Sequence, residues 1–148
     1  MMAGFGAKTG LAPDQPCPCG GASYGCCCRP LHRQEQAAAT AEQLMRSRYS
    51  AFALAEIDHL LRTQPSAQPT RERRRALEAS CRQLRWRRLE ILAIEAGGPD
   101  DLHGTVTFAA HYSAGGEAGV LRECSRFGRE AGRPDGAWLY LEALELSD

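Results

Sequence analysis

The chain has 148 residues, the size of one ordinary domain with enough apolar side chains to bury a core. Its 18 basic and 18 acidic residues give a formal net charge of zero, so total charge gives no support for non-specific binding to nucleic acid or anionic membranes. Because no apolar run resembles a membrane span or a signal peptide, we expect a cytoplasmic protein without membrane contact.

The N-terminal part of the chain divides into a tail and a cysteine-rich segment. Residues 1–15 are rich in glycine and alanine and predict a disordered tail, and residues 16–32 hold five cysteines between Cys17 and Cys28. In a cytoplasmic chain such a cluster indicates metal ligands more strongly than disulfides or redox chemistry, which are the alternatives. Two close cysteine pairs around a Gly-Gly turn can close a tetrahedron of thiolates, so the segment predicts one structural Zn²⁺ ion.

Two helices are expected after this segment. The first opens at Thr40, where Gln43 completes a capping box, and runs over 40–64 until Pro65 ends it. The second begins at Thr70, directly after a proline. The apolar residues at helical spacing are Met45, Tyr49, Phe52, Ala53, Ile57 and Leu60 in the first helix and Leu77, Cys81 and Leu84 in the second.

The remaining chain has the alternation and the turn residues of β-strands. The expected strands span 86–95, 102–112, 119–127 and 137–146. Two helices followed by a four-stranded meander predict an α+β domain over 39–148, with the helices packed on one face of an antiparallel sheet.

The cysteine segment resembles the SEC-C zinc motif, which is known from the end of the SecA translocation ATPase. In that motif Cys-x-Cys is followed, about eight residues later, by Cys-Cys or Cys-His. The alignment that matches Tyr24 and Pro30 to the motif's tyrosine and proline implies four ligands and two substitutes. The implied ligands are Cys17, Cys19, Cys27 and Cys28, and the substitutes are Cys26 and His32.

Three further stretches resemble signatures of the YchJ-like family of uncharacterised bacterial proteins. They are Leu44-Met-Arg-Ser-Arg-Tyr-Ser-Ala-Phe52, Glu123-Cys-Ser-Arg-Phe127 and Trp138-Leu-Tyr140. The resemblance covers residues 16–140 and implies a SEC-C zinc knuckle followed by a roll similar to cystatin and nuclear transport factor 2. Members often carry Trp-His-Pro where this chain has Thr63-Gln64-Pro65. The family has no settled activity, so the resemblance supplies none.

Glu123 is the most informative residue outside the knuckle, because it lies on a strand face expected to be buried. A buried carboxylate needs a charged or hydrogen-bonding partner. It is interpreted first as an ion pair between helix and sheet, and alternatively as the carboxylate of a ligand pocket. The ion-pair and pocket candidates are Arg46, Arg48, Ser125 and Arg126, and the weak catalytic candidates are Glu123 itself, Tyr49 and Tyr112.

The region 62–88 contains nine arginines and only two glutamates. Arginine suits phosphates, but no aromatic residue is interleaved before Trp86 to stack on bases. We therefore favour a protein partner over nucleic acid. The leading hypothesis is a non-enzymatic zinc-containing adaptor that docks a protein through the knuckle. The alternatives are a small-molecule binder or enzyme near Glu123, and an RNA- or ribosome-associated protein.

Overall fold

The computed structural model describes residues 10–147, so most of the expected tail at 1–15 lies outside the described residues. Two short turns of helix, η1 (Tyr24–Cys26) and α2 (Arg29–His32), form the cysteine segment. Three helices follow, α3 (Ala41–Leu54), α4 (Ile57–Arg62) and α5 (Thr70–Gln83). The strands are β1 (Arg85–Ala96), β2 (His103–Ala114), β3 (Glu117–Arg129) and β4 (Trp138–Ser147), with η2 (Glu130–Gly132) before the last.

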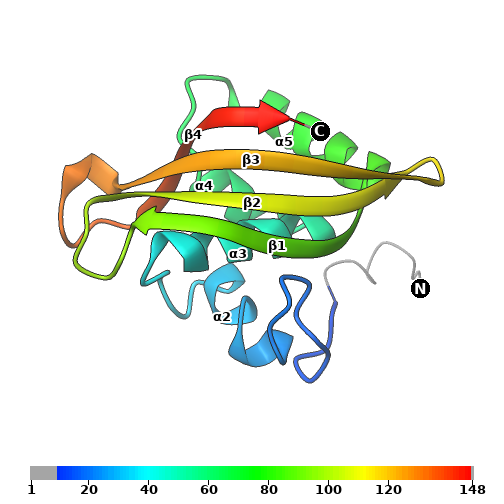
Figure 1. Ribbon diagram of the computed structural model, residues 1–148, viewed down its shortest axis with the longest axis horizontal. Helices are drawn as coiled ribbons and strands as arrows, with labels where there is room; N and C mark the ends of the chain where they lie inside the picture. The colour runs from blue at the N-terminus through cyan, green and yellow to red at the C-terminus, as the bar shows by residue number, and fades with distance from the viewer. Residues whose placement is uncertain (1–9, 148) are drawn as a thin grey trace.

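The sheet confirms the α+β prediction. Its strands run antiparallel in the order β1-β2-β3-β4, and α3, α4 and α5 lie on one side of it (Figure 1). The cross-strand partners Phe108 with Glu123 and Phe127 with Tyr140 point toward the helices. We call this the inner face, and the opposite face, which carries Thr105, Arg126 and Glu142, the outer face.

Helix α3 begins as the sequence predicts. The Thr40 hydroxyl accepts a hydrogen bond from the Gln43 backbone N–H at 3.0 Å, and the Gln43 side chain accepts from the Ala39 N–H at 2.6 Å. These two bonds satisfy backbone donors at the helix start. The turn from β1 to β2 also fixes this end, because the carbonyl of Gly97 accepts from the Ala41 N–H at 2.9 Å.

The single helix expected over 40–64 is wrong, because the chain turns after Leu54. Ala55 adopts a left-handed conformation with φ 61°, and α4 starts two residues later. A residue in this conformation ends a helix, and it is usually glycine, because a residue with a Cβ has a steric cost there. The turn redirects the chain so that the side chains of Ile57 and Leu60 are buried. Burial of these two apolar side chains offsets the steric cost of the left-handed conformation at Ala55.

The core lies between α3 and the inner face. Leu44, Val106, Phe127 and Trp138 are all buried there, and the Trp138 indole N–H donates to the Ala39 carbonyl at 3.2 Å. The same cluster of buried residues continues through Tyr24 and the clustered cysteines. The cysteine segment is therefore part of the domain core in the described chain.

Candidate functional site

Four cysteine sulfurs converge between the N-terminal turn and the start of α2. The Sγ atoms of Cys17, Cys19, Cys27 and Cys28 all lie within 4.8 Å of one another. Three of the Sγ–Sγ distances are 3.5, 3.7 and 3.9 Å. Sulfurs at the corners of a tetrahedron with Zn–S arms of about 2.3 Å would be about 3.8 Å apart. The cluster has the spacing of a four-thiolate metal centre, and its cysteines carry free thiols.

Two glycines allow the chain to bring the sulfurs together. Gly20 has φ 103°, where a side chain would be strained, and its N–H donates to the Cys17 carbonyl at 2.9 Å. A Cβ on Gly21 would lie 2.6 Å from the Cys27 sulfur. Each glycine therefore serves the turn between the two cysteine pairs, one by its backbone conformation and one by its small size.

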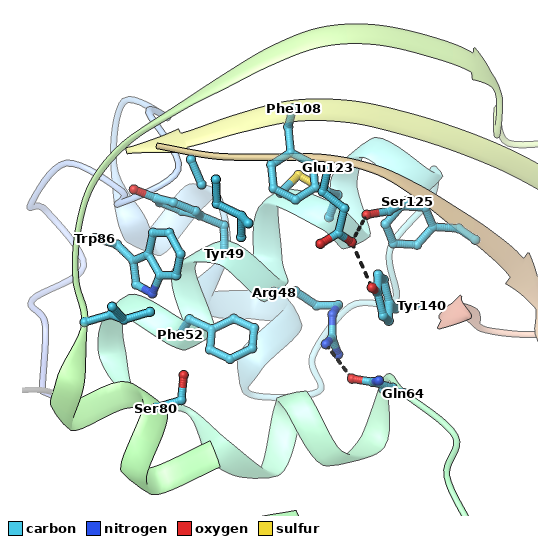
Figure 2. Close-up of a pocket in the computed structure, with 15 residues that line it drawn as sticks. Arg48, Tyr49, Phe52, Gln64, Ser80, Trp86, Phe108, Glu123, Ser125 and Tyr140 are labelled. Carbon is cyan, nitrogen blue, oxygen red and sulfur yellow. Dashed lines mark hydrogen bonds between the residues drawn. The ribbon is translucent and has the colours of Figure 1, made fainter. Parts of the chain in front are cut away.

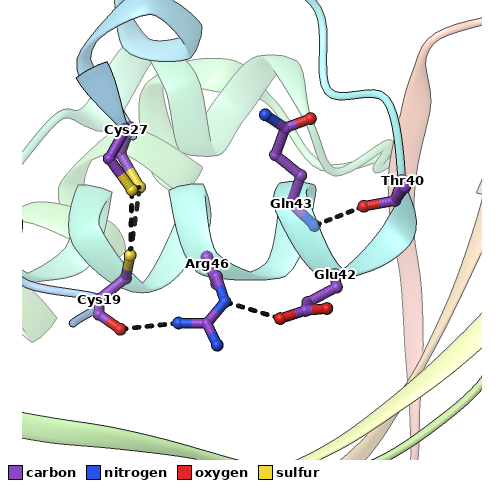
Figure 3. A network of polar contacts seen from close by, with 7 residues as sticks. Cys19, Cys27, Thr40, Glu42, Gln43 and Arg46 are labelled. Atoms are coloured by element: carbon purple, nitrogen blue, oxygen red, sulfur yellow. Dashed lines mark hydrogen bonds and ion pairs between the residues drawn. The ribbon is translucent and has the colours of Figure 1, made fainter. Parts of the chain in front are cut away.

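The cluster is attached to α3 by polar contacts (Figure 3). The Arg46 guanidinium donates to the Cys19 carbonyl at 2.9 Å and pairs with Glu42 at 2.8 Å. On the same side of the helix, the Ser50 hydroxyl lies 3.4 Å from the Cys17 sulfur. The sequence proposed Arg46 as a partner of Glu123, but the structure places it beside the cysteines, where its positive charge favours thiolates.

The thiols influence one another's ionisation. Hydrogen bonds with Cys19 and Cys28 hold the pKa of Cys17 well below its usual range, whereas the hydrogen bond with Cys17 raises the pKa of Cys28. Burial raises the pKa of Cys27 to about 12. Thiolates this close repel one another, so a divalent cation is what would let all four ionise together. Four such ligands leave no open coordination position, which is the chemistry of a structural site.

The two substitute ligands lie outside the cluster. Cys26 is exposed, and His32 is buried with both ring nitrogens engaged. His32 Nε2 donates to the Ser47 carbonyl at 2.8 Å, which leaves Nδ1 to accept from the Tyr24 hydroxyl at 2.6 Å. His32 thus connects the knuckle to α3 through hydrogen bonds.

A cavity of about 330 Å³ lies between α3, the start of β1 and the inner face of the sheet (Figure 2). This volume is at the lower end of the range typical of small-molecule sites. Its walls are mostly apolar. The aromatic residues lining it are Tyr49, Phe52, Trp86, Phe108, Phe127 and Tyr140, and the polar ones are Arg48, Gln64, Ser80, Glu123 and Ser125.

Glu123 has hydroxyl partners where the sequence suggested an arginine. Its Oε2 accepts hydrogen bonds from the Ser125 hydroxyl and, at 2.8 Å, from the Tyr140 hydroxyl. Its Oε1 has no hydrogen-bond partner among the described residues and faces the cavity. Arg126 instead pairs with Glu142 on the outer face, at 2.7 Å.

Arg48 is a charged residue of the cavity that is only 7% exposed. Its guanidinium donates to the Thr63 hydroxyl at 2.7 Å and to the Gln64 side-chain carbonyl at 2.9 Å, and it lies 4.8 Å from the centre of the Tyr140 ring. Burial lowers the pKa of Arg48 to about 10, which still leaves it charged at neutral pH. No carboxylate in the described chain forms an ion pair with it, and neutral acceptors and ring faces take that place.

Trp86 forms part of the cavity wall and is half-buried. Its indole Nε1 is buried and has no hydrogen-bond partner in the described chain. Its ring packs edge-on against Tyr49 at 5.8 Å and Tyr112 at 5.6 Å. Buried indole N–H groups normally have a hydrogen-bond partner, so the unpaired Nε1–H of Trp86 is unusual.

The weak catalytic candidates separate in the structure. Tyr49 lines the cavity, and burial raises its pKa to about 12, so its hydroxyl stays protonated at neutral pH. Tyr112 lies behind Trp86 and against Gly119, outside the cavity lining. Of the three candidates, Glu123 and Tyr49 share the cavity.

Several residues of the site carry little sequence signal. Ser47, Ser50 and His59 are buried polar residues that connect the knuckle, α3 and α4. Serine within a helix is ordinarily exposed, and a lone histidine has no periodicity. The only indication in the sequence that Ser47 and Ser50 are buried is their place in a capped helix, on the face opposite its large apolar residues.

No helix in the described part of the chain combines the length and apolarity needed to cross a bilayer. The arginine-rich helix α5 is mostly exposed, and Arg74 on it pairs with Asp58 at 2.7 Å.

Comparison with known proteins identifies close relatives. Residues 40–143 match the family model for the middle, NTF2-like domain of YchJ. A UPF0225 protein of Ralstonia nicotianae is 46% identical over 136 residues, covering 88% of this chain and 92% of that protein. A UPF0225 protein of Chromobacterium violaceum is 43% identical over 130 residues, covering 86% and 91%.

Two solved structures are similar in fold. The solution structure of a SEC-C motif-containing protein from Rhodopseudomonas palustris matches with a TM-score of 0.73 and 31% identity, covering 90% of this chain and all of that one. The crystal structure of a SEC-C motif-containing protein from Psychrobacter arcticus has a TM-score of 0.73 and 26% identity, covering 92% and 85%.

Proposed function

Since the chain belongs to the YchJ-like UPF0225 family, with a SEC-C motif before an NTF2-like domain, we propose that it is a small-molecule-binding protein with a structural zinc ion. The observation that carries the proposal is the unpaired Glu123 Oε1 in a mostly apolar cavity. Because this oxygen borders the cavity and has no partner among the described residues, a ligand that enters the cavity can donate a hydrogen bond to it.

The metal part of the proposal is supported by the donor set and its spacing. Four sulfurs that all lie within 4.8 Å of one another, three of them at 3.5 to 3.9 Å, suit Zn²⁺, which prefers tetrahedral thiolate ligands. The buried position of Cys17, Cys19 and Cys28 favours a structural role, because substrate has no access to them. Reduced thiols persist in a reducing compartment, which supports a cytoplasmic location.

Elemental analysis of protein purified under reducing conditions tests the metal. We expect one zinc per chain in the wild type and a large loss of zinc in Cys19→Ser, since one ligand of four is removed. Cys26→Ser is the matched control, because Cys26 is exposed and lies outside the cluster. Wild-type protein without zinc, or an equal loss in Cys26→Ser, would contradict the proposed centre.

Ligand-detected NMR with a panel of neutral and charged aromatic fragments tests the cavity. We expect fragments to bind the wild type and to lose binding in Leu121→Trp, because Leu121 lines the cavity and a larger side chain fills it. Arg122→Gln, on the next residue and exposed, is the control. Fragment binding that is absent, or that is unaffected by Leu121→Trp, would contradict the ligand-binding function.

A protein partner at the knuckle is the second candidate function. It is favoured by a groove where the linker after α2 meets α4 and the start of β4, which is lined by the apolar Leu31, Trp138 and Leu139 and also by Arg62. This chemistry fits a short apolar peptide that carries an acidic residue. Capture of such a partner should be lost in Arg62→Glu while zinc content stays unchanged, and capture that survives this change would contradict the assignment.

A further inference from the structure

We propose that the cavity beside Glu123 takes a neutral, planar aromatic compound with one hydrogen-bond donor at its end, as in a phenol. The inference rests on the proposed ligand-binding function and names the class of ligand. Three features of the cavity support it: one carboxylate oxygen without a partner, two opposite charges in the lining, and aromatic walls.

The acceptor for the ligand's donor is Oε1 of Glu123. Its sister oxygen Oε2 already accepts from the Ser125 and Tyr140 hydroxyls, whereas Oε1 has no partner among the described residues. Burial and the hydrogen bond to Glu123 raise the pKa of Tyr140, so its hydroxyl keeps the proton that it donates. Figure 2 shows the carboxylate directed into the cavity. Hydroxyl groups form short hydrogen bonds to carboxylates, so a ligand hydroxyl suits this oxygen.

The other polar side chains of the lining explain why one donor is enough. The Arg48 guanidinium donates to the Gln64 side-chain carbonyl at 2.9 Å, and the Ser125 hydroxyl donates to Glu123. Ser80 lies on α5, across the cavity from the sheet that carries Glu123 (Figure 2). A second polar group close to the first would lose its hydration among mostly apolar walls. The cavity therefore favours a ligand whose one polar group lies at the Glu123 end.

Two opposite charges favour a neutral ligand. Arg48 and Glu123 both line the cavity without forming an ion pair with each other. An ammonium group at Oε1 would be attracted by the Glu123 carboxylate but repelled by the Arg48 guanidinium, and the reverse holds for an anion. A charged ligand therefore gains little to offset the loss of its hydration, whereas a phenol loses less hydration on entry.

The walls favour a flat ring. In Figure 2 the cavity is bordered by Tyr49 and Phe52, and Trp86 lies at the opposite end from the Glu123 carboxylate. Aromatic side chains bind planar rings in stacked and edge-to-face geometries. A bicyclic ring fits within a cavity of about 330 Å³. The ligand's hydroxyl would then lie at Glu123, and its ring would extend toward Trp86.

Four bicyclic probes test the class by ligand-detected NMR titration. They are 2-naphthol, naphthalene, naphthalene-2-carboxylate and 2-naphthylmethylammonium. We expect 2-naphthol to bind at least about tenfold more tightly than each of the others, because it alone is neutral and carries a donor. Naphthalene is the stringent control. It is smaller and more apolar than 2-naphthol, so neither size nor the hydrophobic effect would explain its weaker binding.

Variants then assign the contacts. Glu123→Gln should weaken binding of 2-naphthol about tenfold and leave binding of naphthalene unchanged, because it replaces a charged acceptor by a neutral one of the same size. Arg48→Met should strengthen binding of 2-naphthylmethylammonium, because it removes the cation that repels this probe. Arg122→Gln, which is exposed on the next residue to Glu123, should change none of these affinities. Circular dichroism spectra matching the wild type would show that each variant is folded, and the comparison of probes on the wild type depends on no variant.

The outcomes distinguish the class from the function. The neutral single-donor class is overturned if naphthalene binds as tightly as 2-naphthol, if either charged probe binds more tightly, or if folded Glu123→Gln binds 2-naphthol as the wild type does. If the binding that is seen is still lost in Leu121→Trp, ligand binding in the cavity stands. If none of the four probes and no fragment of the wider panel binds in a way that Leu121→Trp abolishes, both the class and the function are wrong.

Discussion

His59 is a titratable residue that connects α4 to α3. Its Nε2 donates to the Ser47 hydroxyl at 2.9 Å, while that hydroxyl donates to the Leu44 carbonyl at 2.7 Å. The Arg62 guanidinium approaches the other ring nitrogen at 3.4 Å. Burial, assisted by the nearby His32 and Arg62, lowers the pKa of His59 from 6.5 to about 3. The neutral ring therefore suits the folded protein, and a second ring proton would face a cation.

The stability of the protein should fall in acid because of His59. Between about pH 6.5 and about pH 3 the unfolded chain binds a proton that the folded chain does not, so unfolding becomes more favourable as pH falls. We expect the wild type to lose about 2 kcal/mol more of its unfolding free energy than His59→Gln between about pH 7 and about pH 5. Urea denaturation of both proteins at each pH measures the difference. An equal loss in the two proteins would contradict the buried neutral ring.

The sequence is most informative at residues whose chemical type limits their role. Five cysteines within a short segment indicate metal ligands whatever fold surrounds them. Glu123, which is half-buried, and its partner Ser125 were both candidates for a pocket, whereas its partner Tyr140 was not. Ser125 is two residues along the same strand and Tyr140 is on the neighbouring strand, so only the register of β3 with β4 shows that the three side chains meet.

Helix α3 is the element that joins the two parts of the site. Arg46, Ser47 and Ser50 contact the knuckle, whereas Arg48, Tyr49 and Phe52 line the cavity. The two sets occupy different sides of one helix, because residues three and four apart share a side. The sequence predicted one apolar face, but the serines of the second face are fully buried as well. Partly polar packing of this kind leaves no hydrophobic periodicity to detect.

The break between α3 and α4 gives a prediction at the scale of the element. Ala55 has φ 61°, a conformation that glycine adopts without steric cost. We expect Ala55→Gly to raise the unfolding free energy by about 0.5 kcal/mol, part of the relief being offset by the greater freedom of glycine in the unfolded chain. Ala53→Gly, within α3, is the matched control and should lower it by about 1 kcal/mol. Denaturant titration measures both, and equal destabilisation would contradict the left-handed turn.

The strands were easier to predict than this break. Alternating apolar residues and Gly-rich turns mark each strand locally, and all four strands lie within a few residues of their predicted bounds. The turn at Ala55 carries no glycine, asparagine or proline, and apolar residues continue on both sides of it. Tertiary packing of Ile57 and Leu60 decides that turn, and packing of this kind is not visible in a local pattern.

At the scale of the molecule, the cysteine cluster and the cavity lie on opposite sides of α3 and share one core. The cluster of buried residues runs without interruption from Cys17 and Tyr24 through Leu44 to Phe127. Closely packed cores transmit displacements because they contain few voids that absorb them. A metal ion that fixes the knuckle would therefore also fix the position of α3, and with it the cavity residues Arg48 and Tyr49.

Removal of the metal should thus weaken the cavity as well as the knuckle. With Cys17→Ser, or after chelation, we expect the melting temperature to fall by about 5 °C or more and binding of cavity ligands to weaken at least about tenfold. Trp86 fluorescence should change at the same time, because its ring contacts Tyr49 of α3. Trp86→Phe identifies this signal among the two tryptophans of the chain.

Arg126→Gln provides the matched control for this coupling. It removes an ion pair with Glu142 on the outer face, the face of the sheet opposite the cavity, and exposed pairs contribute little stability. Zinc content, fluorescence and ligand binding should all stay at the wild-type level in that variant. If metal loss lowered the melting temperature while ligand affinity and Trp86 emission were unchanged, the knuckle and the cavity would be energetically independent. Helix α3 would then be a shared wall that transmits no displacement between them.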